Sequence, residues 1–159
     1  MHKNTYVIPY SDLEKELDGS TCYFEFQKGE FHKKIGWLRR AKMEFKKEDS
    51  LFIIDEDVMV IFSFFLPGWE LTDIGYFVRG SHRETLMNQL RKFASLLKDG
   101  NSTLDSLEKM GVHKKDGHWS FEEKTEDLDV KKIQNTANEL ANWLEDAFKT
   151  HDTISVLGI

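Results

Sequence analysis

Cysteine and proline are scarce in this sequence, and each scarcity narrows what the protein can be. The 159 residues contain one cysteine, Cys22, so no disulfide can form within the chain and a cytoplasmic location is expected. Cys22 lies between apolar residues and has no base nearby in the sequence, which favours a buried thiol over a nucleophile. The two prolines, Pro9 and Pro67, leave little room for long linkers. We therefore expect a single domain over residues 1–159.

Long hydrophobic runs are also missing. The longest run, Val58 to Leu66, includes a serine and has about half of the ~20 residues that a membrane-spanning helix requires. The first residues, 1–17, lack the apolar stretch of a secretion signal. We therefore expect no membrane among the partners of this protein.

Motifs for cofactors and nucleophiles are absent from the sequence. Neither GxGxxG nor GxxxxGK[ST] occurs, so no glycine-rich phosphate cradle is expected, and no serine lies in GxSxG. His113, Asp116 and His118 lie close together in the sequence, but structural zinc sites recruit cysteines and this chain has one. We read these residues as a solvated turn, and we predict neither a metal nor a cofactor.

Alternating apolar residues predict β-strands in the first half of the chain. Residues 20–27, STCYFEFQ, alternate with a period of two, and Lys28-Gly29 predicts a turn after them. Further strands are expected at 31–38 and 42–46, and a short β-prone stretch lies at 5–8.

The next apolar residues surround an acidic tripeptide, Asp55-Glu56-Asp57. The runs 51–54 and 58–66 on either side of it are typical of a β-hairpin with an acidic tip. Pro67-Gly68 then predicts a turn into a strand at 69–78. Because 58–66 is apolar on both faces of a strand, we expect it near the centre of a sheet that helices cover.

The second half of the chain has a helical period. Apolar residues three and four positions apart predict helices at 82–99, 103–110 and 128–150, and a short helix is expected at 12–18. The C-terminal residues 153–159 either add a strand or lie on the core. Strands before helices indicate an α+β fold, with an antiparallel β-meander of about five to six strands in residues 20–79 packed against the C-terminal helices.

Charge is unevenly distributed along a chain whose net charge is −6. Residues 28–47 carry eight Lys and Arg residues against two acids, whereas residues 48–78 carry seven acids and no Lys or Arg. A basic segment with aromatic residues can bind phosphates and stack on bases. A charged edge strand, whose lysines discourage aggregation, explains the same residues, and the acidity of the whole chain favours it. The candidate binding residues in this segment are Lys33, Lys34, Trp37, Arg39 and Arg40.

A catalytic interpretation rests on Glu30, Glu44 and Lys46. Metal-dependent nucleases place an acid on one strand and a Glu-x-Lys motif on the next, where carboxylates hold Mg²⁺ and the ammonium steadies the attacking water. Glu44-Phe45-Lys46 has this spacing, and Glu30 opens the preceding predicted strand. A three-residue match arises by chance in a chain rich in Glu and Lys. A nucleic-acid-binding or nuclease-like domain is therefore the alternative interpretation.

Acidic residues concentrate in the segments 12–18, 48–57 and 122–129. Such carboxylates can pair with Lys and Arg side chains on a basic partner and increase the association rate. The need for solubility alone also explains this excess of acidic residues. We predict a non-enzymatic, cytoplasmic interaction protein, such as an immunity or inhibitor protein or an accessory subunit, with a protein partner. The predicted binding residues therefore include the acidic residues Asp55, Glu56 and Asp57 as well as the basic ones.

A third interpretation places a small apolar or aromatic ligand between the sheet and a helix. Trp69, Tyr76 and Phe77 are the candidate lining residues. No polar residue converges with them in the sequence, so the specificity of such a pocket has no explanation, and protein binding is the stronger hypothesis.

Overall fold

The sheet has five antiparallel strands in the described part of the chain. The computed structural model describes residues 4–17, 23–30, 46–66, 76–111 and 128–158. The strand order across the sheet is β1-β3-β2-β5-β4. The strands are β1 (Val7–Pro9), β2 (Phe24–Lys28), β3 (Leu51–Ile53), β4 (Tyr76–Arg79) and β5 (Thr153–Gly158). The fold is α+β, as the sequence predicts.

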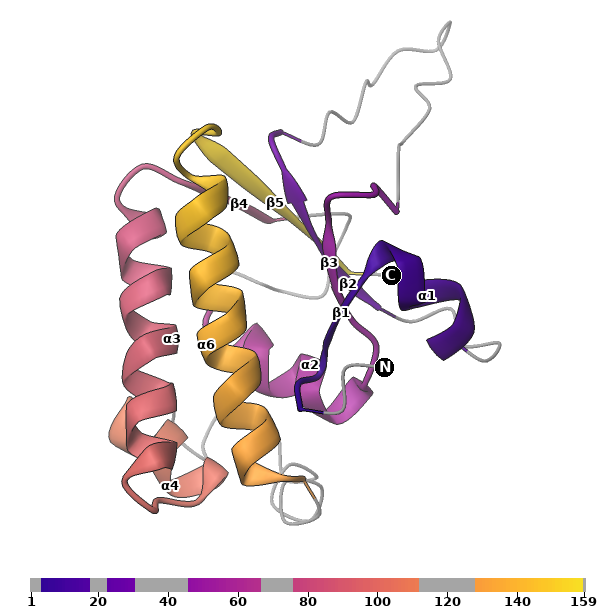
Figure 1. The fold of residues 1–159 in the computed structure, drawn as a ribbon. Coiled ribbons are helices and arrows are strands. Elements are labelled where there is room, and N and C mark those ends of the chain that lie inside the picture. The colour runs from indigo at the N-terminus through magenta and orange to yellow at the C-terminus, as the bar shows by residue number, and fades with distance from the viewer. Residues whose placement is uncertain (1–3, 18–22, 31–45, 67–75, 112–127, 159) are drawn as a thin grey trace, which may run out of the picture.

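Two long helices cover one face of this sheet (Figure 1), and the described residues form five helices in all. These are α1 (Tyr10–Glu16), α2 (Glu56–Ser63), α3 (His82–Lys98), α4 (Thr103–Lys109) and α6 (Val130–Ala147). Helices α3 and α6 lie side by side, and α4 lies at the C-terminal end of α3. The three helices predicted in the second half are confirmed to within a few residues. Helix α1 begins at Tyr10, two residues before the predicted start.

The main core lies between the sheet and helices α2, α3 and α6. Alternate strand residues point into it because side chains on a strand alternate between its faces, so Phe24 and Phe26 of β2 belong to this core. Phe93 of α3 is fully buried, and its ring lies 6.4 Å from that of Phe62 and 5.3 Å from that of Phe65. Each such buried aromatic side chain contributes roughly 1.5–3 kcal/mol relative to an exposed one.

A smaller core lies on the opposite face of the sheet, under α1. Leu13 of this helix packs with Ile8, Tyr23 and Phe52, and the rings of Tyr23 and Phe52 meet edge to face at 5.8 Å. Glu25 occupies the same face of β2 as Tyr23, two residues along the strand.

The predicted hairpin around Asp55 is wrong, because residues 56–63 form helix α2. The Asp55 carboxylate accepts hydrogen bonds from the N–H groups of Asp57 (3.0 Å) and Val58 (3.1 Å), so it caps the helix. Three residues with helical spacing, Val58, Ile61 and Phe62, are buried in the main core. The acidic tripeptide therefore begins a helix, and the strand predicted at 58–66 does not form.

The strand order differs from that of a meander. The C-terminal residues form strand β5, which settles the two possibilities left for 153–159. This strand lies between β2 and β4, with Phe26 opposite Val156 and Val78 opposite Ile154. Helix α6 returns the chain to the sheet, so the last strand enters its interior. Two strands, β1 and β5, thus lie outside the predicted range 20–79.

Candidate interaction surface

The N-termini of α2 and α6 meet at Tyr6, next to edge strand β1. The Tyr6 N–H donates to Thr136 Oγ1 of α6 at 2.7 Å, and Asn135 Nδ2 donates to the Asn4 carbonyl at 3.0 Å. Lys132 Nζ lies 4.2 Å from the centroid of the Tyr6 ring, within the range of a cation–π interaction. These contacts hold the start of β1 against the first turns of α6.

Both helices carry an aspartate N-cap at this point. Asp129 Oδ1 accepts from the Lys132 N–H at 3.1 Å, as Asp55 does for α2. Burial raises the pKa of the Tyr6 phenol, a backbone hydrogen bond at Asp129 lowers that pKa, and the carboxylates of Asp55 and Asp129 raise it further. Ile53 pairs with Val7, so the start of α2 follows directly beside Tyr6, which also contacts the first turns of α6. The two acidic helix N-termini therefore share one end of the molecule.

Helix α1 lies on the other side of β1 (Figure 1), and its sequence contains three acidic residues. Glu14 and Glu16 are exposed on α1, and Glu56 is exposed in the first turn of α2. We call the residues around β1 the acidic edge. Its carboxylates are those of Asp12, Glu14, Glu16, Asp55, Glu56, Asp57 and Asp129. Lys15, Lys131 and Lys132 lie on the same elements, so seven negative charges meet three positive ones, a net of −4.

The predicted basic binding residues Lys33, Lys34, Trp37, Arg39 and Arg40 lie outside the described residues. The structure does describe both ends of the basic segment. At its start, the Gly29 N–H donates to the Thr153 carbonyl at 2.9 Å, and Ser155 Oγ donates to the Gly29 carbonyl at 2.7 Å. At its end, the N–H groups of Lys46 and Lys47 donate to the Glu25 carboxylate.

The candidate catalytic residues are not brought together where they are described. Glu30 Oε1 lies 3.6 Å from Arg79 Nη1, in an exposed ion pair at the β4 side of the sheet. The N–H groups of Lys46 and Lys47 are instead bound to the Glu25 carboxylate. Lys46 Nζ lies 6.0 Å from the centroid of the Tyr23 ring. Glu44 lies outside the described residues.

Glu25 is a site residue that the sequence motifs do not identify. Its side chain is 0% exposed although it is a carboxylate on a central strand. The signal was present: Glu25 is the one charged residue in STCYFEFQ, a segment that otherwise reads as a buried strand. A buried carboxylate requires partners that satisfy both oxygens, so its position predicts a specific contact.

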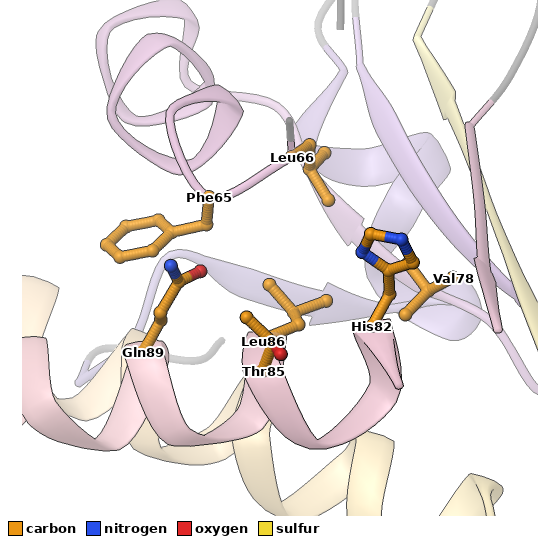
Figure 2. Close-up of a pocket in the computed structure, with 7 residues that line it drawn as sticks. All are labelled: Phe65, Leu66, Val78, His82, Thr85, Leu86 and Gln89. Atoms are coloured by element: carbon orange, nitrogen blue, oxygen red, sulfur yellow. The ribbon is translucent and has the colours of Figure 1, made fainter. Parts of the chain in front are cut away.

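A small cavity lies between the C-terminal end of α2, strand β4 and the first half of α3 (Figure 2). Its volume is about 10 Å³, which is close to the space that one water molecule needs. Its lining residues are Phe65, Leu66, Val78, His82, Thr85, Leu86 and Gln89. Phe77 is 38% exposed and is not among them, and Trp69 lies outside the described residues.

The described residues contain neither a metal-binding cluster nor a membrane-spanning helix. No group of three His, Cys, Asp or Glu side chains in these ranges is placed to hold a metal ion, and His113, Asp116 and His118 lie outside them. None of the five described helices is both long enough and apolar enough to span a bilayer.

Comparison of the chain with family models, with curated proteins and with solved structures found no match.

Proposed function

We propose that this protein is a non-enzymatic interaction protein that binds a basic protein partner through the acidic edge. An inhibitor or immunity protein and an accessory subunit are the classes that fit this description. The observation that supports the proposal is the convergence of two aspartate-capped helix N-termini and the acidic α1 around strand β1.

The arrangement favours binding because part of its charge is held in place. The carboxylates of Asp55 and Asp129 accept backbone hydrogen bonds, so their charges keep fixed positions before any partner arrives. Glu14, Glu16 and Glu56 are exposed around them and can meet Lys or Arg side chains. Such complementarity raises association rates by roughly 10- to 1000-fold at low salt, and its effect falls as salt screens the charges.

The test starts with capture of partners by the purified protein from extracts of the cells that produce it. The captured protein is identified by mass spectrometry and purified, and its association rate constant is measured at low and high salt. We expect the double variant Glu14→Lys/Glu56→Lys to associate at least about tenfold more slowly at low salt. We expect the difference to shrink at high salt, where the Debye length is short.

The matched control is Glu84→Lys/Glu108→Lys, which changes the net charge equally on exposed positions of α3 and α4. We expect it to associate at a rate close to that of the unmodified protein. Equal slowing by both double variants would contradict the acidic edge as the binding surface. Capture that nuclease treatment abolishes would instead favour the alternative, nucleic-acid binding through the basic segment 28–47.

A further inference from the structure

Glu25 is a fully buried carboxylate in the middle of the sheet. It lies on β2, opposite Phe52 of β3 and Leu157 of β5, and its exposed fraction is 0%. An ionised carboxylate is strongly disfavoured in such a position unless hydrogen bonds replace its water, whereas an apolar side chain is accommodated readily. The residue therefore needs an explanation other than the stability of the sheet.

Both oxygens of Glu25 bind backbone groups of one dipeptide. Oε2 accepts from the Lys46 N–H at 2.8 Å, and Oε1 accepts from the Lys47 N–H at 2.9 Å. Lys46 has a φ of 60°, the one positive φ among the described non-glycine residues. A residue in the left-handed conformation can turn successive backbone N–H groups toward one anion, an arrangement called a nest. Here the anion is the Glu25 carboxylate of the same protein.

The contact joins two points that are 21 residues apart in the chain. The basic segment is also held near its start, where Gly29 is bound to Thr153 and Ser155 of β5. Both ends of the basic segment are thus fixed to neighbouring central strands, one to β5 and the other to β2. Binding residues are commonly carried on chain segments whose ends a rigid scaffold holds.

We propose that Glu25 is a positioning residue for the end of the basic segment. Its carboxylate holds Lys46 in the left-handed conformation and fixes where Lys46 and Lys47 present their side chains. The backbone of Lys46 and Lys47 is therefore fixed before any partner contacts the two lysines. A partner that binds there loses less affinity to the conformational entropy of ordering this backbone. The inference concerns the end of the basic segment and not the carboxylates of the acidic edge, and it does not depend on the function proposed above.

The test is amide hydrogen exchange at Lys46 and Lys47, measured residue by residue by NMR on the full chain. Glu25→Gln keeps the shape of the side chain but replaces one acceptor oxygen with a donor. We expect protection at one or both amides to fall by about 10- to 100-fold, the loss expected for a hydrogen bond to a charged group. The three-bond N–H to Hα coupling of Lys46 should lose its left-handed value.

Two comparisons keep this result specific. Asp129→Asn makes the same chemical change at an exposed carboxylate that also binds a backbone N–H, and it should leave Lys46 and Lys47 unchanged. Amides paired between β2 and β5 report on the whole fold. Unchanged protection at Lys46 and Lys47 in Glu25→Gln would overturn the proposal, as would a loss equal to that of the β2–β5 amides.

A second pair of variants tests the same geometry without altering the buried residue, should Glu25→Gln fail to fold. Lys46→Gly adopts a positive φ without strain, so protection at residues 46 and 47 should equal or exceed that of the unmodified protein. Lys46→Val disfavours a positive φ, and protection should fall at least about tenfold. Equal protection in the two variants would contradict the nest.

Discussion

Replacement of Asp55 by alanine tests the assignment of helix α2 directly. The Asp55 carboxylate accepts hydrogen bonds from the N–H groups of Asp57 and Val58, so Asp55 is the N-cap of this helix. Loss of an N-cap aspartate costs about 1 kcal/mol, and loss of its charge at the helix dipole adds about 0.3–1 kcal/mol. We therefore expect Asp55→Ala to lower the free energy of unfolding by about 1–2 kcal/mol.

The loss is measured by urea denaturation followed by far-ultraviolet circular dichroism. The urea concentration at the midpoint of unfolding should fall. The dependence of the unfolding free energy on urea concentration should stay constant, because the same surface is exposed on unfolding. A chain of this length should also lose about 2–4 °C of Tm per kcal/mol. Asp55→Ala should also lower the pKa of Tyr6, because the Asp55 charge raises it.

Two further variants identify the cause of the loss. Asp55→Asn retains an acceptor oxygen, and Asn and Asp are comparable N-caps. Its free energy of unfolding should therefore fall by less than about half of the decrease caused by Asp55→Ala. Glu56→Ala removes a first-turn charge without removing a cap and should cost only about 0.3–0.5 kcal/mol. If Asp55→Ala were no more destabilising than Glu56→Ala, residue 55 would not cap a helix, and an exposed acidic turn would explain the sequence better.

Two other predictions concern the sheet. Burial, and then the charge of Glu25, raise the pKa of Tyr23 from 10.0 to about 12. The folded state therefore favours the neutral phenol, and roughly 2–3 kcal/mol of stability that is fully present below pH 10 should be lost as the pH rises from 10 to about 12. Tyr23→Phe should remove this part of the pH dependence in denaturation curves, and an unchanged dependence would contradict the assignment. Ile154→Ala on β5 should cost about 2–5 kcal/mol because Ile154 is fully buried between β2 and β4. Val130→Ala, at a residue that is 38% exposed, should change stability by less than about 0.5 kcal/mol, and an equal effect at the two sites would contradict the central position of β5.

The candidate site was only partly predictable from the sequence. The acidic residues 55–57 were identified as surface residues, but their role as the start of a helix was not. Their approach to Asp129 depends on the contacts of Tyr6 with α6, which join residues 130 positions apart. Local patterns carry no information about such pairs, so the acidic edge could be recognised only in the folded protein.

The sequence by itself determined helices α3, α4 and α6. Each has apolar residues at helical spacing on one face, and Ser102 caps α4 by accepting from the Asp105 N–H, a signal readable from neighbouring residues alone. The sequence left residues 56–63 ambiguous, because an apolar run with nearly no polar face favours neither a period of two nor one of 3.6, and the Asp55 cap could equally be read as an acidic turn. Packing in the folded protein showed that they form a helix. The tertiary structure also decided the place of β5 and the partners of Glu25. These depend on pairings between distant parts of the chain, whose free energy comes from burial and hydrogen bonds formed only when those parts meet.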